Sequence, residues 1–241
     1  MIKVENFTKK YGNKIAANDV TFEVKPGEIF GFLGPNGAGK TTTIKAIVGL
    51  LKPDSGKISV SGVDVSNDSV ESKKKFTFVP DNPDIYESMT GYQYLNFLAN
   101  VYEVSEEERK ARVKKYAGLF EIEGDLNDYI QGFSHGMKQK VALIGALISD
   151  PDVLILDEPM VGLDAKSAFN LKQLMRERCD NGKSVFFSTH VMEVAEKICD
   201  RLAIIKNGSI LFTGSLEELR RQDNSNDSLE QIFLELTEWN K

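Results

Sequence analysis

Apolar and polar residues alternate in short runs at the start of the chain. Residues 2–7 and 20–25 both show this alternation, which is typical of strands that bury one face. Residues 29–33, Ile-Phe-Gly-Phe-Leu, form an apolar run with the character of a strand, and residues 43–50 have a helical pattern. The pattern therefore predicts two strands, and then a strand that enters a helix through the glycine-rich segment at 34–42.

The middle of the chain has the periodicity of helices. Its first apolar helix face is supplied by Tyr92, Leu95, Phe97 and Leu98. Residues 105–108, Ser-Glu-Glu-Glu, predict a capping box that opens an exposed and charged helix. A second apolar helix is predicted over 132–149.

Strands and helices alternate again in the second half of the chain. Apolar runs predict strands at 153–156, 184–188 and 202–205, with helices near 166–180 and 191–198. This order predicts an α/β fold whose alternation is interrupted by a helical insertion.

The end of the chain departs from that alternation. Residues 223–227 form a polar linker, and Ser228 with Gln231 predicts a helix cap. The positions that follow at i, i+3, i+4 and i+7 are apolar: Leu229, Ile232, Phe233 and Leu236. We expect an amphipathic helix there that packs on its own domain.

Composition limits the classes of protein that fit the chain. Its 241 residues, 41% hydrophobic and 27% charged, are enough for a substantial core. A net charge of −6 argues against an affinity that depends on neutralising many nucleic-acid phosphates. Cys179 and Cys199 lack C-x-x-C spacing and are expected to be buried or half-buried thiols in a reducing compartment. No signal peptide is recognisable, and the longest apolar run, 141–148, is too short to span a bilayer, so we expect a soluble, cytosolic protein.

The segment at 34–42 carries the first candidate chemistry. It has the form G-x-x-x-x-G-K-T of a phosphate-binding P-loop, between a predicted strand and a predicted helix. Backbone N–H groups of such a loop wrap a phosphate, the helix N-terminus adds its positive dipole end, and the lysine reaches the outer phosphates. The Thr41 hydroxyl is placed to hold Mg²⁺. The predicted nucleotide-binding residues are Gly34, Asn36, Gly37, Ala38, Gly39, Lys40, Thr41 and Thr42.

A second candidate site follows the predicted strand at 153–156. Asp157 and Glu158 stand at its C-terminal end, where a buried parallel strand would deliver them beside the phosphates. Asp157 would hold Mg²⁺ or its water shell. Glu158 could take a proton from an attacking water.

Three further segments resemble the motifs of ABC ATPases. Residues 133–140, Phe-Ser-His-Gly-Met-Lys-Gln-Lys, resemble the signature motif of that family, which is usually Leu-Ser-Gly-Gly-Gln. Residues 162–164, Gly-Leu-Asp, resemble its D-loop, and residues 188–190, Ser-Thr-His, resemble the strand end that carries its switch histidine. The order and spacing of all five elements match the family over nearly the whole chain. The signature variant and the tail are similar to the ATP-binding subunits of ABC-2-type exporters.

The resemblance implies further site residues. Ser134 and the Gly136 N–H would meet the γ-phosphate of ATP bound by an opposite subunit in a head-to-tail dimer, with Asp164 at that interface. His190 would contact the γ-phosphate and orient the attacking water, and Tyr11 would stack on adenine. An ordinary turn aromatic at Tyr11 stays an alternative.

Two positions depart from the family pattern. His135 and Met137 replace the usual glycine and glutamine of the signature, while Ser134 and Gly136 keep the family residues. Asp81 stands where the family places a glutamine near the metal and the water. An aspartate could still bind Mg²⁺, but it cannot donate a hydrogen bond, and its charge could weaken ATP binding when metal is scarce.

The resemblance also implies the organisation of the chain. It predicts a P-loop NTPase core with an N-terminal antiparallel β subdomain and an inserted helical subdomain. The predicted segments are 1–83 for the first part of the ATP-binding core, 84–149 for the helical subdomain, 150–214 for the second part of the core and 215–241 for a helical tail.

The leading hypothesis is an ATP-hydrolysing subunit of an ABC exporter, with ATP and Mg²⁺ as cofactors. Its expected partners are an integral membrane permease and a second ATP-binding subunit, identical or not, with no nucleic acid. The permease would hold it on the cytoplasmic face of the membrane. One alternative is a non-transport ABC ATPase acting on nucleic acid or ribosomes. Another, suggested by Asp81, is a regulatory subunit that binds ATP and hardly hydrolyses it.

Overall fold

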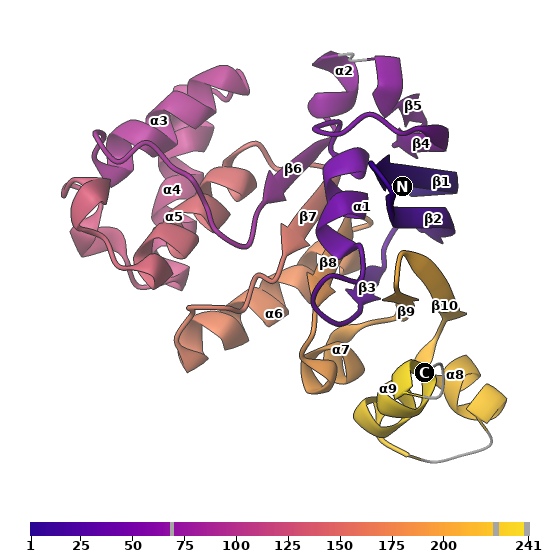
Figure 1. Ribbon diagram of the computed structural model, residues 1–241. Coiled ribbons are helices and arrows are strands. Elements are labelled where there is room, and N and C mark those ends of the chain that lie inside the picture. The colour runs from indigo at the N-terminus through magenta and orange to yellow at the C-terminus, as the bar shows by residue number, and fades with distance from the viewer. Residues whose placement is uncertain (68–69, 224–226, 239–241) are drawn as a thin grey trace.

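Two sheets and a set of helices make up the protein, which we describe from a computed structural model of residues 1–67, 70–223 and 227–238 (Figure 1). A six-stranded sheet has the order β10-β9-β3-β8-β7-β6. All of its neighbouring strands are parallel except β9 and β10, which are antiparallel. Its strands are β3 (Ile29–Leu33), β6 (Phe76–Val79), β7 (Val153–Asp157), β8 (Ser184–Thr189), β9 (Arg201–Lys206) and β10 (Ser209–Gly214).

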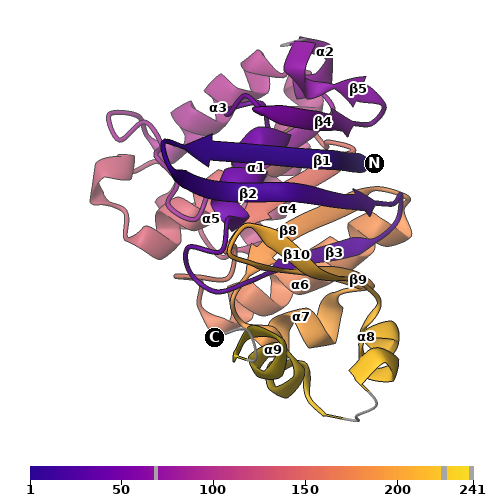
Figure 2. The same ribbon diagram turned by 45° about the vertical axis from the view of Figure 1, so that its right-hand side comes forward.

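The second sheet is antiparallel and confirms the predicted N-terminal β subdomain. Its order is β2-β1-β4-β5, with the strands β1 (Ile2–Tyr11), β2 (Lys14–Val24), β4 (Ser55–Val60) and β5 (Val63–Asp64). Helix α1 (Lys40–Ile47) lies behind β1 and β2 in Figure 2. Phe22 of β2 packs against Phe30, Phe32 and Phe186 of the parallel sheet, with ring centroids 5.3–5.8 Å apart. These contacts close one apolar core between the two sheets.

The opposite face of the parallel sheet is covered by α6 (Ala165–Asp180) and by the last helix of the helical insertion. Alternate side chains of a strand point to opposite faces, so Val153 and Ile155 join the core with α1, while Leu154 and Leu156 join the core of the insertion. The insertion comprises α3 (Gly91–Val101), α4 (Glu106–Leu119) and α5 (His135–Ile148), between β6 and β7. It stands on the left in Figure 1.

Two details of the insertion differ from prediction. Phe97 does not belong to the buried face of α3, because its side chain is 39% exposed and packs edge-on against Tyr86. Ser105 does cap α4 by accepting the Glu108 N–H at 3.3 Å. The Glu108 carboxylate, however, accepts from the Ser105 hydroxyl at 2.8 Å, so the reciprocal bond of a capping box is missing.

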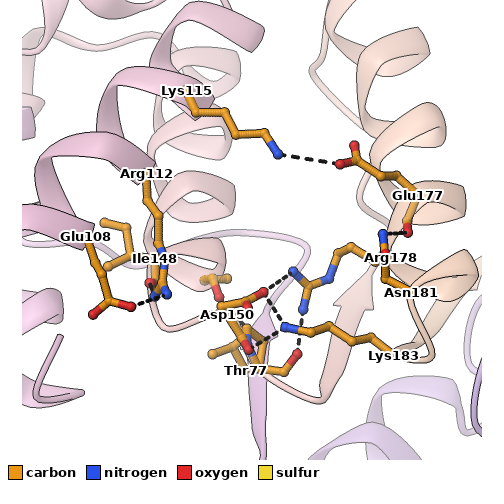
Figure 3. Close-up of polar contacts among 12 residues, drawn as sticks. Thr77, Glu108, Arg112, Lys115, Ile148, Asp150, Glu177, Arg178, Asn181 and Lys183 are labelled. Carbon is orange, nitrogen blue, oxygen red and sulfur yellow. Dashed lines mark hydrogen bonds and ion pairs between the residues drawn. The ribbon is translucent and has the colours of Figure 1, made fainter.

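A polar cluster joins the insertion to the core where α5 leads into β7 (Figure 3). Arg112 of α4 donates to the carbonyl oxygen of Ile148 at 2.6 Å, which satisfies a free carbonyl at the end of α5. Arg178, which is buried, pairs with Asp150 at 3.0 Å, and Lys183 binds the same carboxylate. This end of the insertion is thus held by Arg112 from within the insertion and by Arg178 and Lys183 from outside it.

The remaining helices cover the rest of the sheet and the end of the chain. They are α2 (Val70–Lys73), α6 (Ala165–Asp180), α7 (Met192–Ile198), α8 (Leu216–Asp223) and α9 (Leu229–Glu238), with short 3₁₀ turns at Val65–Asn67, Glu123–Asp125 and Ile130–Gly132. None of the helices in the described ranges is long and apolar enough to cross a membrane.

The C-terminal helix packs on its own chain, as predicted. Ser228 and Gln231 form the predicted cap of α9, with bonds of 3.0 Å and 3.3 Å in the two directions. Leu229, Ile232 and Phe233 are buried in a cluster with residues of α7 and β9. Of the predicted polar linker, residues 224–226 lie outside the described residues, and Asp223 ends α8. Helix α8 lies within the helical tail predicted over 215–241, whereas β5 and β10 were not predicted.

Candidate functional site

The predicted site residues meet at one edge of the parallel sheet. Neighbouring strands end at nearly the same level, since Leu33 of β3 pairs with Thr189 of β8 and Asp157 of β7 pairs with Ser188. The loops that leave these strands at their C-terminal ends are therefore adjacent. They carry the P-loop after β3, His190 after β8, Glu158 after β7 and, one strand further, the segment with Asp81 after β6.

The P-loop turns into α1 through a backbone that only glycine fits. Gly39 has a φ of 109°, and a β-carbon there would lie 2.3 Å from the carbonyl oxygen of Ala16. Lys40 is only 7% exposed, and its ammonium group donates to the carbonyl oxygen of Gly34 at 2.7 Å. Ala38 is buried, and its carbonyl oxygen accepts the Gly208 N–H at 2.8 Å. The loop is thus anchored to both sheets.

Asp157 is held by two hydroxyl donors. Thr41 donates to one oxygen of its carboxylate at 3.2 Å, and Ser188 donates to the other in a short hydrogen bond. Burial raises the pKa of Asp157, the two hydroxyl bonds oppose that rise, and the negative charges of Glu158 and Asp81 add to it. The site therefore holds more negative charge than its own residues compensate.

Glu158 connects the lysine and the histidine. One oxygen of its carboxylate lies 2.9 Å from Nδ1 of His190 and 3.6 Å from the Lys40 ammonium nitrogen. Its backbone has a φ of 48°, an uncommon value for a residue with a side chain, and its N–H donates to Ser188 at 3.2 Å. Such local strain persists only where the surrounding structure fixes it, which here it does through β7 and β8.

These residues line a pocket of about 280 Å³. The predicted residues that line it are Tyr11, Asn36, Gly37, Gly39, Lys40, Thr41, Thr42, Asp81, Asp157 and Glu158. Pro35, Lys14 and Ala16 also line it and were not predicted. Of the other residues predicted for this half of the site, Gly34 contributes its carbonyl group, Ala38 is buried beneath the loop, and His190 reaches the pocket through Glu158. Tyr11 is 50% exposed, and the Lys9 ammonium group lies over its ring 5.9 Å from the centroid, so a planar ligand would stack on the ring face away from Lys9.

The pocket suits a phosphate ligand together with a metal ion. Mg²⁺ in proteins is usually held by one or two carboxylates or hydroxyls, with phosphates and waters as the other ligands. Thr41 and Asp157 offer two oxygens 3.2 Å apart, and Asp81 lines the same pocket. In the described ranges no group of three or more His, Cys, Asp and Glu residues could hold a metal by itself. The donor set thus fits a metal that arrives with a phosphate.

The signature residues lie outside this pocket. Ser134 caps α5 by accepting the Met137 N–H at 3.3 Å, and neither Ser134 nor Gly136 lines the pocket. Figure 1 shows α5 in the insertion to the left of β6, and α1 to the right of it. Asp164 caps α6, accepting from the N–H and the hydroxyl of Ser167 at 2.8 Å and 2.7 Å. Within one chain the structure therefore brings together the P-loop half of the predicted site and leaves the signature half apart.

Comparison with known proteins identifies the family. The sequence profile of the family described as ABC transporter matches residues 17–161, more than half of the chain. The chain belongs to the ABC transporter family. The ABC-type transporter ATP-binding protein EcsA of Bacillus subtilis (strain 168) is 36% identical over 238 residues, which cover 98% of this chain and 96% of EcsA. The linearmycin resistance ATP-binding protein LnrL of the same strain is 37% identical over 222 residues, 91% of this chain and 70% of LnrL.

Solved structures agree with this relationship. A structure described as the ATP-binding subunit of an ABC transporter superposes with a TM-score of 0.94 at 35% identity, and the match covers 98% of this chain and 99% of that one. The ATP-binding cassette MJ0796, in a dimeric post-hydrolysis state bound to ADP and Pi, superposes with a TM-score of 0.81 at 27% identity over 90% of this chain and 99% of that one. The protein is accordingly an ATP-binding subunit of an ABC transporter, and its family chemistry is ATP hydrolysis.

Proposed function

We propose that the protein binds Mg²⁺-ATP in the pocket at the P-loop and hydrolyses it in a head-to-tail dimer, which powers export through a separate membrane permease. One observation carries this proposal. The P-loop, both carboxylates and the histidine meet at one sheet edge, while Ser134 and Gly136 lie outside the pocket. A site with only half of its anion-binding groups calls for a second subunit that supplies the rest.

Nucleotide binding would reorganise the lysine. In the structure the Lys40 ammonium group donates to the carbonyl oxygen of Gly34 at 2.7 Å and lies 3.6 Å from the Glu158 carboxylate. The outer phosphates of ATP are stronger acceptors, so the ammonium group turns to them and releases Glu158. Backbone N–H groups of the P-loop hold the inner phosphates, and Tyr11 stacks on the base.

Thr41 and Asp157 would hold the metal, with Asp81 within reach of its water shell. The Thr41 hydroxyl donates its proton to Asp157, which would leave lone pairs on its oxygen for a metal ion. A bound Mg²⁺ neutralises charge on the phosphates during their transfer. The charges of Glu158 and Asp81, which add to the rise in the pKa of Asp157, would favour a cation at this place.

Glu158 and His190 would act on the attacking water. Once Lys40 has moved, the free carboxylate of Glu158 can accept a proton from water. The 2.9 Å contact with Nδ1 of His190 fixes the orientation of that carboxylate. Ser134 and the N–H of Gly136 from the second subunit then meet the γ-phosphate on its open side, so ATP stabilises the closed dimer.

A set of exposed apolar side chains on the insertion supports a permease partner. Tyr86 and Phe97 pack edge-on with ring centroids 5.6 Å apart and are 56% and 39% exposed, and Val101 on the same helix as Phe97 is 58% exposed. Exposed apolar residues of this kind typically mark a protein contact. The names of relatives, such as the Nod factor export ATP-binding protein I of Burkholderia orbicola, support export as the direction.

The proposal is tested by purifying the protein from membranes and measuring phosphate release from ATP with and without Mg²⁺. We expect an integral membrane protein to purify with the chain and Mg²⁺-dependent hydrolysis by the complex. ATP binding without phosphate release would instead indicate a regulatory subunit. Purification with ribosomes or nucleic acid, and with no membrane protein, would overturn the transport function.

A further inference from the structure

The signature segment and the D-loop, Gly162–Asp164, touch each other within one chain. A β-carbon at Gly136 would lie 2.4 Å from the carbonyl oxygen of Gly162, far inside the contact distance. The backbone of Gly136 therefore rests directly on the D-loop. No side chain larger than hydrogen fits between these two segments.

His135 covers the same glycine from the other direction. Gly162 has a φ of 80°, and a β-carbon there would lie 2.5 Å from Cδ2 of the His135 ring. His135 is otherwise exposed and belongs to none of the apolar cores, so its packing serves this contact rather than the interior. At this position the family usually has glycine, which has no side chain to make such a contact.

An ion pair joins the segments a second time. Lys140 lies four residues after Gly136, one turn further along the same face of α5, and its ammonium group is 2.7 Å from the Asp164 carboxylate. Lys140 and the hydrogen bonds from Ser167 hold the pKa of Asp164 well below its usual range. Asp164 therefore stays ionised, and the pair persists over the physiological pH range.

The helix that follows the D-loop is also fastened to the insertion. Asn170 of α6 donates to the carbonyl oxygen of Leu119 at 2.7 Å. Further along, Lys115 of α4 lies 3.5 Å from Glu177, and Arg178 pairs with Asp150 at the end of the insertion (Figure 3). Contacts at the start, the middle and the end of α6 thus oppose its sliding against the insertion.

We propose that His135 and Lys140 are positioning residues that hold the D-loop against the signature helix, so that both segments approach the second subunit's nucleotide as one unit. The proposal rests on the dimer of the proposed function. If the D-loop could shift independently, closure would have to order two segments. Because the contact is already made in the monomer, dimer closure does not have to pay the conformational entropy of ordering the D-loop.

Hydrogen exchange of the ligand-free full-length protein tests the contact itself. The amide groups to follow are those of Val161 and Leu163, which donate to Glu158 and Met160 in the D-loop turn at 3.2 Å and 3.3 Å. In His135→Ala their exchange should rise roughly three- to thirty-fold, while His135→Phe, which keeps a flat ring over Gly162, should exchange like the wild type. Equal exchange in the wild type and both variants would overturn the proposal.

A reversible cross-link tests whether the two segments move together. In Lys140→Cys/Asp164→Cys, a reducible reagent with two thiol-reactive ends would join the sites, and the wild type with its native Cys179 and Cys199 is the control. We expect the cross-linked protein to keep the ATP turnover of the same variant before cross-linking within about twofold. Loss of turnover that reduction restores would mean that the segments must separate, and would overturn the proposal. A wild type without ATPase activity would instead refute the proposed function and leave the exchange result standing.

Discussion

The P-loop leads into α1, and the signature segment leads into α5. Different contacts hold these two regions in place. At the P-loop edge, Lys40, Asp157 and Ser188 are each less than a tenth exposed and lie within one hydrogen-bonded network. At the signature end, Ser134 and His135 are exposed, and the backbone of Gly136 and the ring of His135 rest against the D-loop. The first region is ordered by the core before any ligand arrives, which is what catalytic groups require. The second is a surface that a partner must complete.

The largest effect is expected at Glu158, in the region fixed by the core. Glu158→Gln removes the base and keeps the size of the side chain, so turnover should fall roughly 10²- to 10⁴-fold while ATP stays bound and the dimer stays closed. Phosphate release and sedimentation with ATP measure both quantities. Glu193→Gln, which changes an exposed carboxylate on α7, is the control. Undiminished hydrolysis in Glu158→Gln would remove this residue as the base.

Substitutions of Lys40 and Ser134 should separate the binding of ATP from the closure of the dimer. Lys40→Ala loses the charged contact with the outer phosphates, so ATP affinity of the isolated chain should fall roughly 100-fold, whereas the exposed Lys45→Ala on the same helix should not change it. Ser134→Ala should keep that affinity and lower turnover by about tenfold. Ser105→Ala removes an equivalent helix cap from α4 and controls for stability. Weaker ATP binding by the monomeric Ser134→Ala chain would contradict the division between the two regions.

Substitution of Asp81 should have a smaller effect, and this effect should be on the Mg²⁺ dependence of turnover. Its charge acts on Asp157, so Asp81→Gln and Asp81→Ala should shift the Mg²⁺ concentration for half-maximal turnover by roughly threefold. A titration of turnover against Mg²⁺ at fixed ATP gives this value. An unchanged midpoint in both variants would show that Asp81 does not act on the metal site.

The smallest effect concerns the stability of the ligand-free protein. Burial raises the pKa of Asp157 in the folded chain, so the ionised carboxylate lowers the free energy of unfolding at neutral pH. Asp157→Asn should raise the Tm at pH 7 by about 1–3 °C. The gain should disappear as the pH falls below about 4, where the wild-type carboxyl group is protonated in both states. Asp128→Asn, at an exposed position, should show no such gain at neutral pH.

The sequence predicted the P-loop edge of the sheet better than the signature end of α5. Glycine spacing and strand-terminal acids identified the P-loop, Asp157 and Glu158, because parallel strands bring such groups to one edge. Lys14 and Ala16 were missed, since they line the pocket only through the placement of a β-hairpin far from the P-loop in sequence. The contact between His135 and Gly162 depends on side-chain packing between separate segments, which no periodicity reports. Strand β10 was missed because its residues are mostly half-buried and give a weak pattern.

A mixture of two impaired variants tests most directly the claim that each site is shared between subunits. Lys40→Ala lacks a working P-loop and keeps its signature, and Ser134→Ala has the opposite defect. A head-to-tail dimer with one chain of each has one site with both halves intact, so an equal mixture should regain up to roughly a quarter of wild-type turnover, because random pairing makes half of the dimers mixed. Turnover no higher than the average of the two separate variants would mean that both halves act within one chain and would contradict the account.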